Sequence, residues 1–327
     1  MFKTRNNFLK VVKDGPTTRG ARARVSMLGR SATPSLRQTP SMCVRLQAPI
    51  VLAHGLFGVG PVGVGRLRFA SYFRGIPEFL RAGGNRVVVT RVPPIAGVKT
   101  RARRLGEQVE AAFPGEPVHI IGHSMGGLDA RQLLADPAWS GRILSLTTIG
   151  TPHLGSALAD CARLRVGRVY RLLRMMRIDH RGFLDVTRRA MRAINKAAAR
   201  PHAIPCFSVA GDPTVKDVCW PLRGLYEALH EMEGPNDGLV SVESALAFGT
   251  PLPAWPVDHL RQMNWLAPMP GMAAGPTAFE LYEAVVTNLA RHGFAAEDDP
   301  EDRSAAPGTS PASRWKCPRF FAFGRRA

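Results

Sequence analysis

The chain has 327 residues, 45% of them hydrophobic and 21% charged, which is ordinary for a soluble globular protein with one large or two small domains. Its formal net charge is +19, but residues 47–159 and 201–294 together are neutral, because the excess of Lys and Arg lies in residues 1–46 and 160–200. This distribution, without a helix-turn-helix, zinc-finger, RRM or KH pattern, argues against nucleic acid as a partner. It fits peripheral contact with an anionic membrane surface, with a mere gain in solubility as the alternative.

Cysteine spacing and hydropathy exclude further classes. The five cysteines form no C-x-x-C pair, so we expect neither a metal site nor a disulfide framework, but buried or free thiols. No run is apolar enough for a transmembrane helix, and the N-terminus lacks the apolar core of a secretory signal. We therefore favour a cytoplasmic location. Nothing in the composition indicates an oligomeric state.

From residue 49 onward, apolar strands alternate with amphipathic helices. We predict strands at 49–53, 86–92, 117–122, 143–150 and 203–211, and helices at 71–84, 98–113, 126–135 and 277–291. In the second helix Leu105 and Val109 belong to an apolar stripe, and Arg101, Arg103 and Arg104 are expected on the opposite, solvated face. The repetition predicts an α/β fold with a mostly parallel, doubly wound sheet.

Residues 156–200 interrupt this alternation with two basic helical stretches and no strand. Val169, Leu172, Leu173 and Met176 have helical spacing there, with arginines between them. One interpretation is an ordinary surface helix, and the other is a mobile lid whose arginines meet lipid head groups. We divide the chain into a disordered leader (1–46), a catalytic domain (47–294) with the lid at 156–200, and a disordered tail (295–327). A transit peptide, or a true start at Met27 or Met42, is the alternative for the leader.

A G-x-G-x-x-G pattern at Gly58, Gly60 and Gly63 follows the first strand and raises the possibility of a dinucleotide site. The next helix is expected only near Ser71, however, so no helix N-terminus would face a pyrophosphate, and no acidic residue ends the second strand. We therefore expect no bound cofactor, and a loop that turns sharply past its strand instead.

Nucleophilic chemistry is indicated at the end of the third strand. Gly122-His123-Ser124-Met125-Gly126 is G-x-S-x-G at a strand-to-helix junction, where small residues permit the sharp turn that exposes a nucleophilic serine. The backbone N–H of Met125 and one from the loop "HGLFG" at residues 54–58 would form the oxyanion hole.

Ser124 needs a base and a carboxylate that orients it, and on this fold both follow the serine in the chain. His259 lies in a loop and His292 ends the last helix, so we favour His259 as the base. Asp237 lies in the tight turn "GPNDG" and is favoured over Asp212 as the acid. Asp258 is expected to be a surface or supporting group.

Seven segments in order resemble the bacterial triacylglycerol lipase family of α/β-hydrolases over residues 48–292. They are "PIVLAHGLFG", "YFRGIPEFLRAGG", "RLGEQVEAAF", "IIGHSMGGLDAR", "LTTIGTPHLGSALAD", "IPCFSVAG" and "NDGLVS" with "DHL". The resemblance implies a triad of Ser124, Asp237 and His259, an oxyanion hole made by Leu56 and Met125, and a lid at 156–200.

Two departures limit what this resemblance implies. Secreted members bind calcium through an Asp two residues after the catalytic His, and this chain has Arg261 there, so no metal is expected. We expect Arg261 to pair with Asp212 or Asp217 instead. Members with a disulfide carry a Cys shortly after the triad Asp, where this chain has Glu243.

The expected function is a serine hydrolase that cleaves carboxylic esters of lipids, as a triacylglycerol lipase or esterase, through an acyl-enzyme on Ser124. A role in lipid degradation follows from this, and the basic, Met- and Leu-rich segment at 156–200 predicts a preference for medium or long acyl chains. The alternatives are a phospholipid deacylase or acyltransferase with the same triad, and a catalytically silent lipid-binding hydrolase fold.

Overall fold

The computed structural model describes residues 43–56, 72–165, 181–197, 204–266 and 275–296. The chain divides into two units, 1–41 and 42–327, and all described residues belong to the second unit. Most of the expected leader and tail, the glycines of the G-x-G-x-x-G pattern and the stripe from Val169 to Met176 lie outside the described residues.

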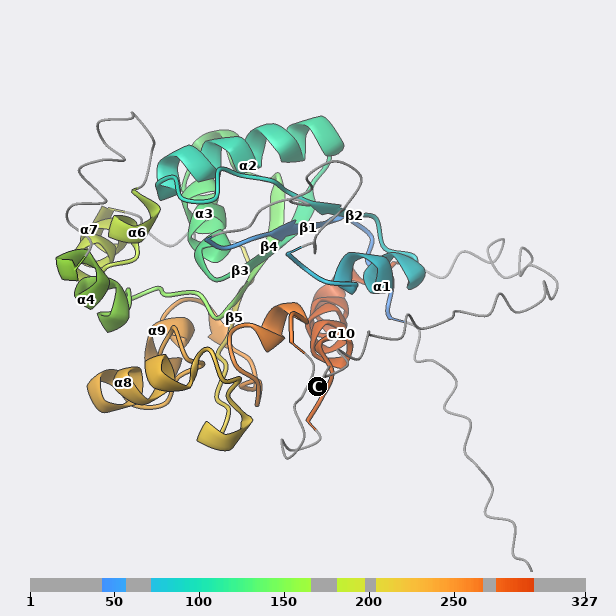
Figure 1. Cartoon of the computed structure of the whole chain (residues 1–327). Coiled ribbons are helices and arrows are strands. Elements are labelled where there is room, and N and C mark those ends of the chain that lie inside the picture. Colours follow the sequence, from blue (N-terminus) through green and yellow to red (C-terminus); the bar gives the residue numbers. More distant parts are fainter. Residues whose placement is uncertain (1–42, 57–71, 166–180, 198–203, 267–274, 297–327) are drawn as a thin grey trace, which may run out of the picture. The chain divides into compact units, whose positions relative to one another are not determined.

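A single parallel sheet forms the centre of the described fold, with the strand order β2-β1-β3-β4-β5-β6 (Figure 1). The central strands are buried on both faces, which explains their unbroken apolar runs. The five predicted strands are confirmed, and β6 is an addition too short to leave a pattern. The strands are β1 Ile50–Ala53, β2 Val87–Val89, β3 Val118–His123, β4 Ile143–Ile149, β5 Cys206–Val209 and β6 Thr250–Pro251.

Helices cover both faces of this sheet (Figure 1). Ile50 and Leu52 pack toward α1 and α10, whereas Val51 and Ala53 pack toward α2 and α3, because alternate residues of a strand point to opposite faces. The predicted doubly wound α/β architecture is therefore confirmed. The α-helices are α1 Ile76–Ala82, α2 Val98–Ala112, α3 Met125–Leu134, α4 Ala157–Arg165, α6 Gly182–Asp185, α7 Arg188–Ala197, α8 Arg223–Glu233, α9 Val242–Leu246 and α10 Ala278–Leu289.

Two predicted elements are shorter than expected. The helix expected at 71–84 begins only at Ile76, because Gly75 has φ +74 and Pro77 follows in the first turn. The strand expected at 86–92 ends at Val89, because the chain then leaves the sheet ladder. The N–H of Arg91 donates to Gln108 Oε1, and the N–H of Val92 donates to His54 Nε2.

The packed part of the chain extends past both expected boundaries. Cys43 and Leu46, which the sequence placed in the leader, are buried in the core. Leu46 forms an antiparallel bridge with Ala295, and the N–H of Ala296 donates to the carbonyl of Arg45. The two ends of the domain are therefore joined by backbone hydrogen bonds, which a pattern of side chains does not predict.

The described part of the 156–200 insertion is helical and contains no strand, as expected. Its helix α6 docks on the entry to α2, where Asp185 Oδ2 accepts the N–H of Val98 at 2.8 Å and the N–H of Gly182 donates to Ile95 O at 3.0 Å. Within the described residues, no helix is long and apolar enough to cross a membrane.

Four cysteines lie in the described residues, and they are present as thiols, as expected. Cys43, Cys206 and Cys219 are buried, whereas Cys161 on α4 is exposed. Burial raises the pKa of Cys43 to about 11 and that of Cys219 to about 12. The buried thiols therefore act as small apolar core residues.

Tyr282 on α10 carries a buried hydroxyl that has no hydrogen-bond partner among the described residues. Because an unpaired buried hydroxyl costs about 1–3 kcal/mol, we expect Tyr282→Phe to raise the free energy of unfolding in urea titrations. Tyr72→Phe is the matched control and should lower it, since the buried Tyr72 hydroxyl is hydrogen-bonded to His123 Nδ1 at 2.8 Å. A less stable Tyr282→Phe variant would contradict this assignment.

Candidate active site

Ser124 lies in a strained turn between β3 and α3. Its φ of +55° is one of two positive values among the described non-glycine residues, and such strain persists only where the surroundings enforce it. Gly126 is pressed so closely against the carbonyl of Ala53 on β1 that a side chain there would collide with it. A Cβ on Gly122 would lie 2.7 Å from the N of Gly127. The small residues of G-x-S-x-G are therefore required by close contact between the turn and its neighbours.

The side chain of Ser124 lies beside the loop that follows β1. A Cβ on Gly55 would come within 2.7 Å of Ser124 Cβ and 3.1 Å of Ser124 Oγ. The backbone of the serine is fixed from the neighbouring strand, since its N–H donates to Ile149 O and its carbonyl accepts from Thr151 Oγ1. No described residue is hydrogen-bonded to Ser124 Oγ, which leaves that oxygen available to a reactant.

Asp237 and His259 are brought together across 22 residues of sequence. His259 Nδ1 donates to Asp237 Oδ2 at 2.7 Å, and the N–H of His259 donates to the carbonyl of Asp237. The other carboxylate oxygen accepts the N–H groups of Leu239 and Val240. Because the carboxylate can only accept, the proton of a neutral His259 sits on Nδ1 and leaves Nε2 free to act as a base.

This pair lies next to the serine turn. The ring of His123, the residue before Ser124, is 4.6 Å from the ring of His259. Gly150 at the end of β4 lies against both partners, since a Cβ there would be 3.0 Å from Asp237 Oδ2 and 3.2 Å from His259 Nδ1. The ends of β3 and β4 therefore meet the Asp237–His259 pair, as expected for a site at the carboxyl edge of a parallel sheet.

The alternative candidates have other positions and partners. Asp212 is exposed, and His292 is exposed with its Nδ1 bonded to the carbonyl of Asn288. Asp258 was expected as a surface or supporting group. It is fully buried, and its carboxylate accepts the N–H groups of Cys219, Leu260 and Arg261. Asp258 therefore shapes the loop that carries His259.

The two residues expected to form an oxyanion hole lie at the ends of neighbouring strands. Met125 begins α3, and Leu56 follows Gly55 in the loop after β1. Within the described residues, neither backbone N–H donates to an acceptor. The side chains of both residues belong to one apolar cluster, which also includes Val186 and Met191 of the insertion. The insertion therefore packs directly over this part of the site.

Arg101 was expected on the solvated face of its helix, and this prediction is wrong. The side chain is 0% exposed and pairs with the buried carboxylate of Asp129 on α3, with Nε to Oδ2 at 2.9 Å. Burial raises the pKa of Asp129 above its usual range, and the guanidinium opposes that shift. Residue 101 lies one helical turn before Leu105 and therefore belongs to the buried stripe, a spacing that would have revealed its position.

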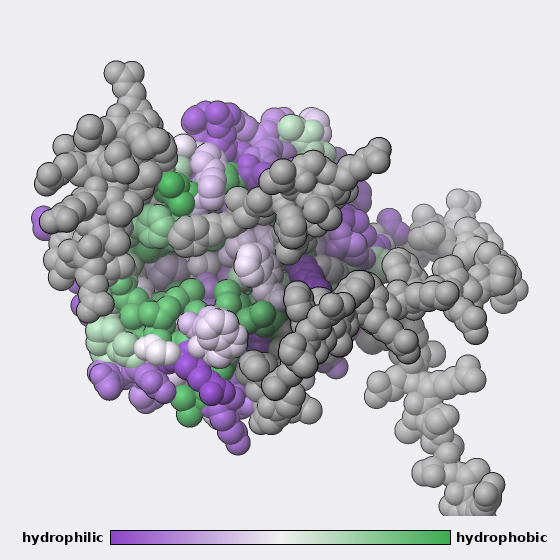
Figure 2. All heavy atoms as spheres, in the orientation of Figure 1, coloured by the Kyte–Doolittle hydropathy of each residue, from purple (hydrophilic) through white to green (hydrophobic). Residues whose placement is uncertain are grey.

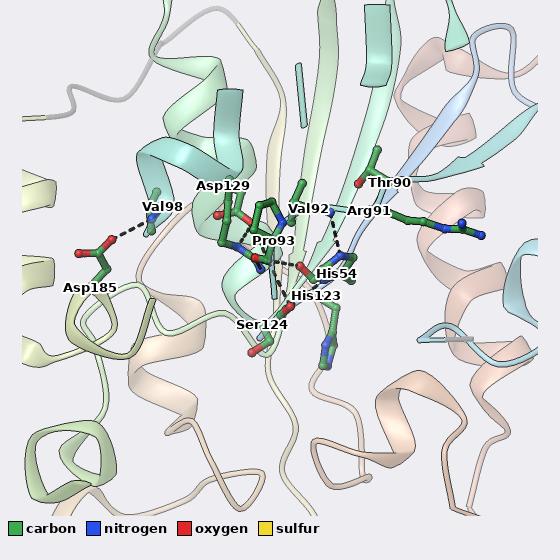
Figure 3. Close-up of polar contacts among 12 residues, drawn as sticks. His54, Thr90, Arg91, Val92, Pro93, Val98, His123, Ser124, Asp129 and Asp185 are labelled. Atoms are coloured by element: carbon green, nitrogen blue, oxygen red, sulfur yellow. Dashed lines mark hydrogen bonds and ion pairs between the residues drawn. The ribbon is translucent and has the colours of Figure 1, made fainter. Parts of the chain in front are cut away.

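The Arg101 guanidinium holds the loop after β1. Its NH2 atom donates to the carbonyls of His54 at 2.6 Å and Gly55 at 3.2 Å, and NH1 donates to the carbonyl of Pro93. Its partners His54, Pro93 and Asp129 lie close together beside Ser124 (Figure 3). Because these two carbonyls belong to the residues just before Leu56, the Arg101 guanidinium restrains the backbone that sets the direction of the Leu56 N–H.

Comparison with known proteins agrees with the fold described above. Residues 100–191 match a family model described as alpha/beta hydrolase fold. The structure is similar to that of Staphylococcus hyicus lipase, with a TM-score of 0.60 at 20% identity over 75% of this chain and 95% of that one. A metagenomic carboxyl esterase gives a TM-score of 0.59 at 18% identity, over 81% of this chain and 82% of that one. The chain has the α/β-hydrolase fold.

Sequence comparison finds relatives in both fungi and bacteria. The chain is 31% identical to triacylglycerol lipase 2 of Saccharomyces cerevisiae over 210 residues, 60% of this chain and 63% of the yeast protein. It is 38% identical to a triacylglycerol lipase of Vibrio cholerae over 118 residues, 35% of this chain and 36% of that protein. The chain thus spans less than two thirds of these relatives' length.

The buried ion pair of Arg101 and Asp129 can be tested by substitution. Arg101→Met should lower the free energy of unfolding by about 3–5 kcal/mol, because Asp129 is then a buried carboxylate without its partner. Adding Asp129→Leu should restore most of the stability, since the replacement side chains are apolar and of similar size.

The stable double variant isolates the effect on the loop. Without the guanidinium, the carbonyls of His54 and Gly55 each lose a donor, and Gly55 keeps only His54 Nδ1, so we expect the kcat of the double variant on an ester substrate to stay well below that of the wild type. Urea titration and initial rates on the same samples measure the two effects. A double variant with wild-type stability and wild-type kcat would show that the guanidinium does not position the loop.

Proposed function

We propose that the protein is a serine hydrolase that cleaves carboxylic ester bonds of lipids, in the manner of a triacylglycerol lipase. The observation that carries the proposal is the Asp237–His259 hydrogen bond beside the strained turn of Ser124. Asp237, His259 and Ser124 supply the buried carboxylate, the imidazole and the half-buried hydroxyl that activation of a serine requires.

In the proposed mechanism Ser124 Oγ attacks the ester carbonyl carbon while His259 Nε2 takes its proton. The backbone N–H groups of Leu56 and Met125 stabilise the oxyanion of the tetrahedral intermediate. Its collapse breaks the bond to the alcohol oxygen, which receives the proton from His259, and leaves an ester on Ser124. Water, deprotonated by His259, then attacks that acyl-enzyme, and the free acid leaves. Asp237 holds the imidazole in the required tautomer throughout.

The side chains next to the oxyanion residues are apolar. Half-buried Leu56 packs against the buried cluster of Val98, Met125, Val186 and Met191, and contact with such side chains favours an alkyl chain by about 0.8 kcal/mol per buried CH₂ group. The names of the yeast and Vibrio relatives, both triacylglycerol lipases, support the same substrate class.

Peripheral contact with a lipid surface is also part of the proposal. On the face shown in Figure 2, hydrophobic side chains gather over α8 and α9. The exposed apolar side chains in and near these helices are Leu154, Leu225, Met232 and, at 72% exposure, Trp220. Exposed cations, Arg189, Arg192 and Lys196, lie on the adjoining helix α7. Apolar insertion together with cationic attraction is the combination that holds a protein on an anionic membrane.

Replacement of the nucleophile tests the mechanism. Ser124→Ala should lose essentially all turnover of p-nitrophenyl esters and all labelling by a fluorophosphonate probe, while its melting temperature stays near that of the wild type. The acyl-chain profile of the wild type, from acetate to palmitate, tests the substrate class. Activity confined to acetate would identify a soluble carboxylesterase, and transfer to added alcohols an acyltransferase. Wild-type turnover by Ser124→Ala would refute the mechanism.

We further propose that the activity needs no calcium. Arg261, which occupies the position of the expected calcium ligand, is a buried cation and would repel a metal ion. The ion pair of Arg261 with Asp212 or Asp217 that we expected is not formed among the described residues. We expect incubation with EDTA to leave kcat and the melting temperature unchanged. A loss of either that added Ca²⁺ restores would contradict this proposal.

A further inference from the structure

Gln262 is a buried amide that touches the proposed triad and has no place in the mechanism given above. It lies on the 3-10 turn Arg261–Met263, three residues after His259, and its side chain is fully buried. Its Nε2 donates to Asp237 Oδ2 at 3.0 Å, the same oxygen that accepts from His259 Nδ1. The carboxylate of Asp237 therefore receives four hydrogen bonds, two from backbone N–H groups and two from side chains.

The other end of this amide reaches the strand that carries the serine. Gln262 Oε1 lies 2.8 Å from Nε2 of His123, the last residue of β3. Nδ1 of His123 lies 2.8 Å from the hydroxyl of Tyr72, which packs against Gly55 in the loop after β1. One row of buried hydrogen bonds thus runs from that loop, past the serine turn, to the carboxylate of Asp237.

The chemistry of the groups fixes the direction of each bond in this row. The Asp237 carboxylate only accepts, so the amide must present its NH₂ group to Asp237 and its oxygen to His123. His123 then carries its proton on Nε2 and accepts from the Tyr72 hydroxyl on Nδ1. Burial and the neighbouring His259 lower the pKa of His123 well below its usual range, so the ring stays neutral and keeps that acceptor.

The backbone around Gln262 leaves space for the amide on two sides. Gly150 at the end of β4 and Gly211 after β5 both approach it, and a Cβ on Gly211 would collide with Gln262 Nε2. A Cβ on Gly150 would lie 2.5 Å from Gln262 Oε1. An amide held between two glycines and bonded at both ends has one conformation available.

We infer that Gln262 is a positioning residue, which orients the Asp237 carboxylate toward His259 and ties it to the strand end that carries Ser124. The inference rests on the proposed function. Other groups of its size fail at this point for physical reasons. A glutamate would place a second negative charge against Asp237, and an apolar residue would leave Asp237 Oδ2 and His123 Nε2 each without one buried partner.

The predicted consequence concerns the basicity of His259. Among the described residues, the ionisable groups that face the amide and its partners are Asp237, His123, His259 and, at the far end, Tyr72. The carboxylate of Asp258 is turned to backbone N–H groups instead. Removal of the amide N–H leaves the charge of Asp237 less neutralised, so the imidazolium form of His259 is stabilised. The acid limb of the pH–rate profile, where His259 becomes deprotonated, should therefore move to higher pH.

The test compares kcat and KM of Gln262→Ala and Gln262→Glu with those of the wild type on a p-nitrophenyl ester from pH 5 to 9. We expect kcat at neutral pH to fall by up to about 100-fold, because misplacement of a catalytic group by about 1 Å costs that much. KM should change little. The acid limb should move upward in both variants, and by about one pH unit or more in Gln262→Glu, whose added charge lies next to the pair.

Gln132 on α3, which is half-buried, gives the matched control. Gln132→Ala and Gln132→Glu should leave the pH profile unchanged. Fluorophosphonate titration counts the active sites in each sample, so that the rates of a poorly folding variant are expressed per competent molecule. If Gln262→Ala does not fold, the isosteric variant Gln262→Glu still tests the inference.

The inference is overturned if the acid limbs of both Gln262 variants coincide with the wild-type limb. This holds whatever activity or stability is lost, and it would leave Gln262 a purely structural role. A downward shift would overturn it as well. If Ser124→Ala retains turnover, the proposed function fails and the inference with it. An inactive Ser124→Ala together with unshifted Gln262 variants refutes only the role of Gln262.

Discussion

The contact between α3 and β1 is the constraint on which the rest of the site depends. Gly126 at the start of α3 meets the carbonyl of Ala53 with no room for a side chain between them. Only a sharp turn brings a helix back so close to the sheet, and Ser124, at φ +55°, is the residue in that turn. The strain costs of the order of 1–3 kcal/mol, and it is sustained because β1, β3 and β4 surround the turn on a sheet buried on both faces.

Two buried polar networks then fix the parts that the sheet alone would leave loose. Arg101 and Asp129 hold the loop after β1 from the side of α2 and α3, whereas Gln262 and His123 hold the Asp237 carboxylate from the side of β3. Both networks cross between elements that are distant in sequence. In a low-dielectric interior each missing partner is costly, so the geometry of the loops is enforced as strongly as that of the strands.

Hydrophobic periodicity and turn chemistry predicted the sheet, the layers and the turn of Ser124, because those features follow from local patterns. The same reasoning selected Asp237 and His259, and the structure brings them together, although their catalytic role stays a prediction. Arg101 was misplaced because a charged side chain was assumed to be solvated, although its spacing to Leu105 puts it on the buried stripe. Only its partner Asp129, on another helix, leaves no local signal. Gln262 left no signal for a similar reason, since its partners lie 25 and 139 positions away.

The buried thiols give this domain an internal indicator of its own folding. Cys43 packs where the two ends of the domain meet, Cys206 begins β5, and Cys219 lies under the loop of Asp258. Each is shielded in the native state and becomes reactive only when its surroundings open. The rate at which a thiol reagent modifies each cysteine therefore distinguishes fraying of the domain's ends from opening of the sheet or of the loop that carries Asp258 and His259, without any engineered residue.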